Sequence, residues 1–146
     1  MTPQEIADRS TAAMWDGDEA TRWFGIELSK VGPGCASTTL TVQDHHLNGH
    51  KICHGGVIFA LADTAFAFAC NSYNQLAVAQ HNTISFVAPG KRGEILTATA
   101  TETSTAGRSG IYDVTVTGEN GRVIAEFRGV SRAIPGQHFE EIEVPS

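Results

Sequence analysis

Cysteine is scarce in this sequence, and its cysteines do not pair in any recognisable pattern. Cys35, Cys53 and Cys70 are an odd number, and none of them stands close to another. Small secreted domains are held together by disulfide bonds between an even number of closely spaced cysteines. This sequence lacks that pattern, so we expect its thiols to be free and its compartment to be reducing. The first residues also have no basic start followed by an apolar run, so no signal peptide is expected. These absences predict a cytoplasmic chain.

Basic residues and long apolar runs are also few. Ten Lys and Arg stand against 16 Asp and Glu, which gives a net charge of -6 and argues against a general nucleic-acid binder. A local group of arginines can still bind a small anion. The most apolar stretch, residues 56–69, is short, rich in alanine and interrupted by Asp63, so we expect no membrane span. A length of 146 residues predicts a single domain, 1–146.

The stretch 54–69 is the most informative part of the sequence. It opens with His-Gly-Gly and continues as an almost unbroken apolar run without proline, which predicts a helix buried on nearly every side. Asp63 is its one ionisable residue after His54. The residues three and four positions away on the helix are all apolar: Phe59, Ala60, Phe66 and Ala67. A carboxylate there is unfavourable unless function requires it or a neighbouring strand binds it.

The segments on either side predict one further helix and a sheet. Thr2, Pro3 and Glu5 form a capping box, which predicts a helix over 3–14 within an N-terminal helical segment, 1–24. A polar loop follows residue 43, and the acidic tail over 135–146 is expected to be loosely held. Alternating residues bounded by turns predict strands at 26–31, 35–42, 76–88, 94–104, 111–117 and 122–133.

These elements predict an α+β fold in which a sheet curls around one helix. Four of the six strands follow the buried helix and are joined by short turns, the pattern of an antiparallel meander. The helix over 56–69 would be about 21 Å long, and the longer strands match it. A single twisted sheet can bury such a helix only by wrapping around it, which is the hotdog arrangement.

The motif around the buried helix resembles a known family. Residues 48–56, Asn-Gly-His-Lys-Ile-Cys-His-Gly-Gly, followed by Ala-Leu-Ala-Asp at 60–63, resemble the hotdog-fold acyl-CoA thioesterases, and more narrowly the PaaI type of bacterial phenylacetate degradation. The resemblance extends from about residue 24 to residue 132. It implies hydrolysis of an acyl-CoA, such as an aryl- or arylacetyl-CoA like (hydroxy)phenylacetyl-CoA, with no cofactor and no metal.

Two residues of this motif suit thioester hydrolysis. Gly55 would lie at the helix N-terminus, where an unpaired backbone N–H can polarise a thioester carbonyl, although the glycines could instead serve only close packing. Asp63 can act as general base on water or as nucleophile. Its apolar surroundings should raise its pKa, yet it must stay ionised to act.

The loop before the helix offers further candidates. By resemblance, Asn48 would orient water or the acyl group, although an Asn-Gly turn explains it as well. His54 would either donate to the substrate or fix the loop. The histidines and the cysteine of this segment match no structural zinc pattern, so no metal is expected; they are His45, His46, His50, Cys53 and His54.

Two turns carry cations that could hold coenzyme A. Lys91 and Arg92 lie in one predicted turn, and Arg108, Ser109 and Gly110 lie in the other, over 106–110. The resemblance implies that these turns contact the nucleotide and pantetheine. Arg108 is the stronger candidate because flanking glycines let the backbone approach phosphates. Solvated surface charge is the alternative, above all for Lys91.

Two other functions fit parts of the pattern. A non-catalytic acyl-CoA binder would keep the glycines and cations but would not require Asp63. A hotdog enoyl-CoA hydratase would use an Asp and His pair on a different motif. Asp63 within this motif therefore favours hydrolysis.

The spacing of Gly55 and Asp63 predicts a composite site. Eight residues on a straight helix separate their backbones by about 12 Å, whereas a carbonyl and its attacker must approach to about 3–3.5 Å. Two antiparallel helices related by a two-fold axis would bring each Asp63 to the Gly55 end of the other. We therefore expect a homodimer as the minimal unit, and the resemblance implies that such dimers pair into a homotetramer.

Overall fold

Three α-helices and two short 3-10 helices, Asp44–His46 and Glu119–Gly121, accompany the sheet in the computed structural model, which describes residues 1–142. Helix α1, Pro3–Asp16, begins with the predicted capping box: Thr2 Oγ1 accepts from the N–H of Glu5 at 3.1 Å, and the N–H of Thr2 donates to the Glu5 carboxylate at 3.2 Å. It ends two residues later than predicted. The short helix α2, Glu19–Phe24, follows, and the predicted buried helix is α3, Gly55–Cys70, one residue longer at each end than predicted.

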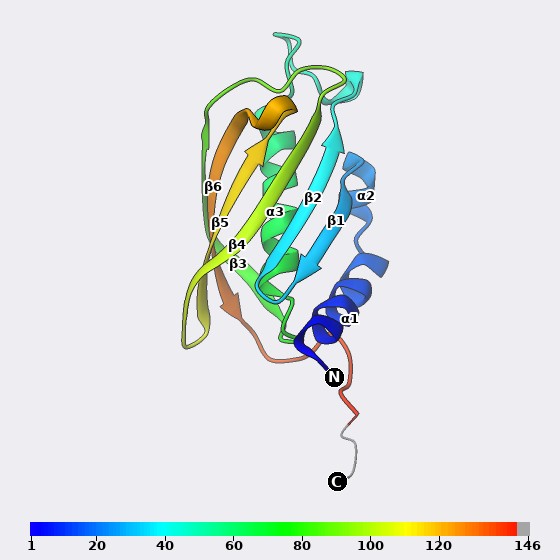
Figure 1. Cartoon of the computed structure of the whole chain (residues 1–146), viewed down its shortest axis with the longest axis vertical. Helices are drawn as coiled ribbons and strands as arrows, with labels where there is room; N and C mark the ends of the chain where they lie inside the picture. Colours follow the sequence, from blue (N-terminus) through cyan, green and yellow to red (C-terminus); the bar gives the residue numbers. More distant parts are fainter. Residues whose placement is uncertain (143–146) are drawn as a thin grey trace.

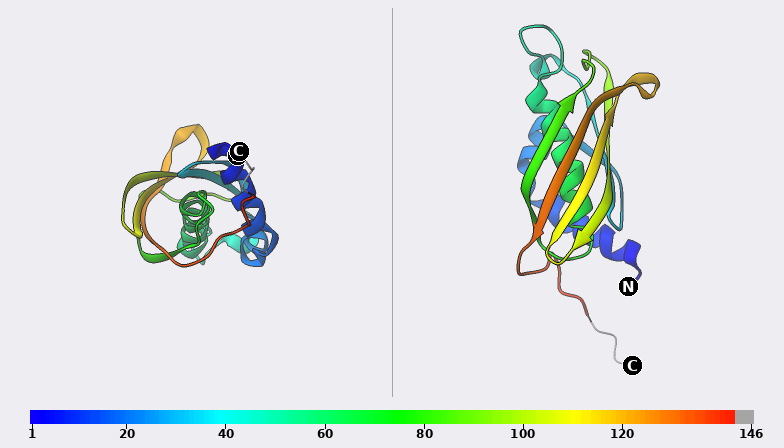
Figure 2. Two further views of the ribbon diagram at one scale, coloured as in Figure 1. Left: turned by 90° about the horizontal axis from the view of Figure 1, so that it is seen from below. Right: turned by 90° about the vertical axis from the view of Figure 1, so that its left-hand side faces the viewer.

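Six strands form one antiparallel sheet. In chain order they are β1 Glu27–Gly32, β2 Cys35–Thr41, β3 Ala77–Phe86, β4 Ile95–Ala106, β5 Ser109–Thr117 and β6 Val123–Ala133. Their order across the sheet is β1-β2-β4-β5-β6-β3, and every neighbouring pair is antiparallel. The sheet curls around α3 (Figures 1 and 2), which confirms the predicted hotdog arrangement.

The core lies between α3 and the concave face of the sheet. Phe66 is 1% exposed; its ring packs edge-to-face with Tyr112 and is tilted against Phe127. A Cβ atom at Gly129 of β6 would lie 2.7 Å from the Phe66 ring, so only glycine permits this close approach. Alternate residues of the strands facing α3 are fully buried: Leu40, Leu96, Ala98, Ala100, Val114 and Val116.

The N-terminal helices and the described part of the tail are anchored to this core. Helix α1 lies along the edge strand β1, and Trp15 reaches the Phe68 ring of α3 with ring centroids 6.2 Å apart. The side chain of Asn74 binds the backbone of His138 and Phe139. The last residues of the predicted loose tail, 143–146, lie outside the described residues.

The β4–β5 hairpin differs from the prediction. We expected a turn over 106–110, but Ala106 and Ser109 are paired, so the turn consists of Gly107 and Arg108 alone. Gly107 takes the positive φ of +61° that such a tight turn requires. Gly110 is buried within β5, where a Cβ atom would collide with Ser131. Its missing side chain therefore serves packing and does not free a loop.

No helix within residues 1–142 is long and apolar enough to cross a membrane.

Candidate active site

A groove opens at the N-terminal end of α3. It has a volume of about 460 Å³ and is lined by Asn48, Ile52, Cys53, Gly55, Ile58, Phe86, Val87, Ala88 and Pro89. The loop before α3, the helix start and the segment after β3 thus form its walls. Most of the lining is apolar, which leaves the Asn48 side chain and the backbone at Gly55 as its main polar features.

The start of α3 leaves one donor available at this groove. His54 is the N-cap: its Nδ1 accepts from the N–H of Gly56 at 2.8 Å, and its carbonyl oxygen accepts from the N–H groups of Val57 and Ile58. Within residues 1–142 the N–H of Gly55 has no partner. A Cβ atom on Gly55 would lie 3.0 Å from Phe86 Cζ, so glycine avoids a close contact with a ring that lines the groove. This geometry suits a carbonyl oxygen that gains negative charge.

Two histidines of this segment, His46 and His54, have structural partners. His54 fixes the helix start, which is one of the two roles considered for it. His46 is buried; its Nδ1 accepts from the N–H of Gln43 at 2.9 Å and its Nε2 lies 2.7 Å from the carbonyl oxygen of Phe24. Within the described chain, no group of three or more His, Cys, Asp or Glu residues is placed to hold a metal ion.

Asn48 both forms a turn and lines the groove. Its Oδ1 accepts from the N–H of His50 at 2.9 Å and more weakly from that of Ile52 at 3.4 Å. The Nδ2 group has no partner within residues 1–142 and is free to donate. The two interpretations of Asn48 are therefore compatible, because its carbonyl shapes the loop while its amide nitrogen stays available.

Asp63 lies further along α3 and does not line the groove of its own chain. Its Oδ1 accepts from Nδ2 of Asn82, on β3, at 3.0 Å. Burial raises the pKa of Asp63, and the hydrogen bond from Asn82 opposes that shift. The helix is continuous from Gly55 to Cys70, so about 12 Å of helical rise separates Gly55 from Asp63. Within one chain, the unpaired N–H of Gly55 and the carboxylate of Asp63 are therefore too far apart to act on the same atom.

Sequence reasoning missed Asn82. The strand β3 contains a bulge between Ala79 and His81, where one residue has no partner on β6. A bulge shifts the alternation of inward and outward side chains, so a period of two does not reveal which polar residue of β3 faces α3. The buried carboxylate itself was the only signal that some strand residue had to bind it.

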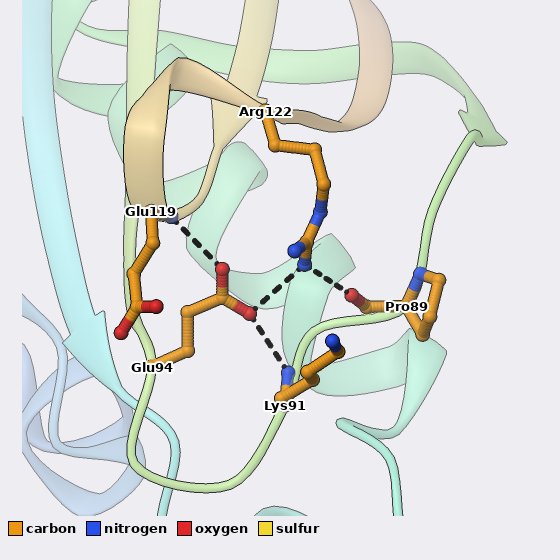
Figure 3. Close-up of polar contacts among 5 residues, drawn as sticks. All are labelled: Pro89, Lys91, Glu94, Glu119 and Arg122. Atoms are coloured by element: carbon orange, nitrogen blue, oxygen red, sulfur yellow. Dashed lines mark hydrogen bonds and ion pairs between the residues drawn. The ribbon is translucent and has the colours of Figure 1, made fainter.

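A buried carboxylate just before β4, also missed from the sequence, fixes one wall of the groove (Figure 3). Glu94 is 3% exposed and accepts from the N–H groups of Lys91 and Glu119 and from Arg122 Nη2, at 2.9, 2.9 and 3.0 Å. Arg122 Nη2 also donates to the carbonyl oxygen of Pro89 at 2.8 Å. This cluster, the Glu94 clasp, therefore holds the Pro89 side of the groove in place.

The electrostatics of the Glu94 clasp favour the ionised form. Burial alone would raise the pKa of Glu94, but the two backbone N–H donors and the Arg122 guanidinium outweigh it and hold that pKa below its ordinary value. The adjoining backbone connects the clasp to the helix start, because the N–H of Cys53 donates to the carbonyl oxygen of Gly90 at 2.8 Å.

The two predicted cation groups lie at opposite ends of one chain (Figure 1). Arg108, Ser109 and Gly110 help to line a separate pocket of about 240 Å³ beside the C-terminal end of α3. Lys91 and Arg92 lie near the groove, where Arg92 forms an exposed ion pair with Asp44 at 2.6 Å. A single chain therefore does not bring the two groups together.

Comparisons with known proteins agree with this architecture. The family described as Thioesterase superfamily matches residues 50–125. Acyl-coenzyme A thioesterase PaaI of Escherichia coli K12 is 44% identical over 124 residues, 85% of this chain and 89% of that protein. The solved structure of the E. coli PaaI protein from the phenylacetic acid degradation operon has a TM-score of 0.91 at 40% identity, covering 93% of this chain and 99% of that one.

A second structure, of a variant phenylacetic acid degradation protein PaaI from Thermus thermophilus, has a TM-score of 0.77 at 32% identity and covers 80% of this chain and 100% of that one. The family match spans more than half of the chain, and the PaaI relative matches most of it. The chain is therefore a hotdog-fold thioesterase that belongs to the thioesterase superfamily.

Proposed function

We propose that this protein hydrolyses acyl-CoA thioesters, with the N–H of Gly55 polarising the carbonyl and Asp63 supplying the attacking oxygen or activating water. The observation that carries the proposal is the unpaired N–H of Gly55 at an open apolar groove, on the same helix as a buried carboxylate. The relationship to E. coli acyl-coenzyme A thioesterase PaaI supports a coenzyme A substrate.

The groove favours an aromatic acyl group. Apart from Asn48 it offers hydrocarbon, backbone and the Phe86 ring to a bound acyl chain. A phenylacetyl or hydroxyphenylacetyl group presents a flat apolar face to such a wall, and Asn48 Nδ2 can donate to the thioester carbonyl or to a water beside it. The phenylacetic acid degradation operon of the E. coli relative is consistent with this substrate class.

The reaction needs two subunits. We infer a homodimer in which Asn48 and Gly55 of one chain face Asp63 of the other, with dimers pairing into a tetramer. The edge strand β3 supports this assembly, since β6 pairs with one side of it only. Val78 and Phe86, together with Val87 just beyond the strand, are 47%, 55% and 60% exposed. Two β3 edges that pair about a two-fold axis would cover this apolar strip and place the two α3 helices antiparallel.

Each step then has a residue to support it. The ionised carboxylate of Asp63 takes a proton from water as the water oxygen bonds to the carbonyl carbon, and this proton later passes to solvent or to the leaving sulfur. Alternatively, the carboxylate attacks the carbonyl carbon directly to form an anhydride that water then opens. The C=O electrons move to the oxygen held by Gly55 N–H, and the tetrahedral intermediate collapses by breaking the C–S bond. The thiolate of coenzyme A and the free acid are the products.

The same two-fold arrangement brings the cations together. It would place the Arg108 turn of one chain, with Ser109 and Gly110, at the groove end of its partner, near Lys91 and Arg92. A coenzyme A tail leaving the groove would then meet both groups, and the guanidinium of Arg108 suits a phosphate. We also infer that residues 1–146 form one domain, of which 1–24 are an N-terminal helical segment.

A thiol-release assay over a panel of acyl-CoA substrates tests the proposal. We expect phenylacetyl- or hydroxyphenylacetyl-CoA to be hydrolysed fastest, and Asp63→Asn to lose most turnover while it still binds substrate. Turnover near the wild-type rate in Asp63→Asn would contradict the mechanism. Addition of water to an enoyl-CoA, or binding without turnover, would instead support the hydratase or the non-catalytic binder.

A further inference from the structure

The amide of Asn82 is arranged entirely around Asp63. Its Nδ2 donates to Asp63 Oδ1 at 3.0 Å, while its own Oδ1 is buried and has no partner within residues 1–142. A buried amide oxygen without a donor is unfavourable, and an apolar side chain of similar size would avoid this. Asn82 therefore does not stabilise the fold in the way a fully satisfied core amide does.

We propose that Asn82 is a positioning residue that holds Asp63 Oδ1 and leaves Oδ2 as the oxygen that reacts. The inference rests on the proposed role of Asp63. Within the described residues Oδ2 of Asp63 has no hydrogen-bond partner, so it is the oxygen free to take a proton or attack. With Oδ1 bound on the β3 side, rotation of the carboxylate is restricted, and Oδ2 keeps one direction.

The surroundings of Asp63 provide no other charge to hold it. Within residues 1–142 it forms no ion pair. On α3 itself, burial raises the pKa of Cys70 to about 12, so this thiol stays neutral. On the inner face of β4 and β5, the hydroxyl of Tyr112 donates to Glu102 at 3.0 Å. The residues of β2, β3 and β6 that face the core beside α3 carry no titratable side chain: Thr38, Asn82, Ile84, Phe127, Gly129 and Ser131.

Asn82→Leu tests the inference because it keeps the volume and removes both the donor and the orphaned oxygen. We expect unchanged or higher thermal stability, a kcat lowered by about 10-fold to 100-fold, and an acid limb of the kcat profile moved to higher pH. The acid limb moves to higher pH because the hydrogen bond from Asn82, which this variant lacks, favours the ionised carboxylate of Asp63. A purely structural role predicts a loss of stability instead.

Two further variants complete the experiment. Asn82→Asp keeps the shape but places a second carboxyl against Asp63, so the acid limb should move to higher pH again. Thr38→Val is the matched control: its hydroxyl donates to the carbonyl oxygen of Leu61 on the same helix at 3.1 Å and does not touch Asp63. We expect Thr38→Val to lower stability and leave the pH profile in place.

A direct titration separates this inference from the proposed function. The carboxyl carbon of Asp63, in protein labelled with ¹³C-aspartate, is identified by the signal missing in Asp63→Asn. A higher pKa of that carboxyl in Asn82→Leu than in the wild type supports the inference, and an identical titration overturns it, as does a marked loss of stability in Asn82→Leu. A fully active Asp63→Asn would contradict the proposed mechanism, whatever the titration shows.

Discussion

Gly55→Ala probes the carbonyl-binding end of the site with the smallest change available. The added Cβ atom would lie 3.0 Å from Phe86 Cζ and 3.4 Å from Cε1, which is tighter than ordinary contact. Phe86 is 55% exposed in the single chain, and a shift of its ring by a few tenths of an ångström relieves the contact, also at the proposed β3–β3 interface. Alanine is also the better helix former by up to about 1 kcal/mol, and we expect stability within about 1 kcal/mol of the wild type.

The effect on catalysis should be far larger than the effect on stability. The new methyl group and the displaced Phe86 ring both lie in the groove lining, so we expect the bound thioester to shift and its oxygen to be held away from the Gly55 N–H. Loss of one such donor lowers kcat by about 10²-fold to 10³-fold in related acyl-transfer chemistry, and we expect a kcat/KM lower by about 10²-fold.

The assay follows free coenzyme A with a chromogenic disulfide, alongside thermal unfolding of the same preparation. Gly17→Ala is the matched control, because a Cβ atom there meets nothing within 4 Å, and it should leave activity unchanged. Near-normal kcat/KM in Gly55→Ala would show that the glycine only permits close packing and would refute the assignment of its N–H as the carbonyl donor.

Three more outcomes are expected. Asp63→Asn should be more stable than the wild type at neutral pH, because folding raises the pKa of Asp63 and so disfavours its ionised form. This difference in the free energy of unfolding should shrink as the pH falls through the raised pKa; a difference that grows in acid would contradict the raised pKa. Arg108→Ala should raise KM for an acyl-CoA, with a smaller effect on kcat, and leave a short thioester lacking the nucleotide unaffected; equal damage to both substrates would assign Arg108 to the fold. Glu94→Gln should lower the free energy of unfolding by about 2–3 kcal/mol at neutral pH, because Arg122 loses its buried partner. Folding lowers the pKa of Glu94, so the loss of stability in Glu94→Gln should fade as the pH falls below about 4.5, the ordinary pKa of a glutamate. A loss of stability that does not depend on pH would rule out a charge effect.

Local patterns predicted most of the fold. The capping box of Thr2 and Glu5, the buried helix and the strand segments depend on residues near one another in the sequence, and the structure contains them with shifts of a few residues. The prediction of a turn over 106–110 was wrong because the pairing of Ala106 with Ser109 is set by the register of two long strands, which composition does not reveal.

The site was predicted only in part for a similar reason. The groove residues Asn48 and Gly55 belong to one continuous motif, and the structure brings them together. Apart from Lys91, which is close to Glu94 in the chain, the partners of Asp63 and Glu94 come from distant segments: Asn82, Glu119 and Arg122. The hydrogen bond from Asn82 depends on a bulge in β3, and the Glu94 clasp depends on two loops that meet only in the folded chain.

Subunit complementation tests the central claim, a site shared between two chains, most directly. An Asp63→Asn chain is refolded in equal amounts with an Asn48→Ala, Gly55→Ala chain, leaving the helix cap His54 intact; each variant alone should be nearly inactive. Random mixing makes half of the dimers hybrids, each with one intact site of two, so about a quarter of wild-type activity should return. No recovery in a preparation shown to contain hybrid dimers would contradict the shared site and place both groups within one chain.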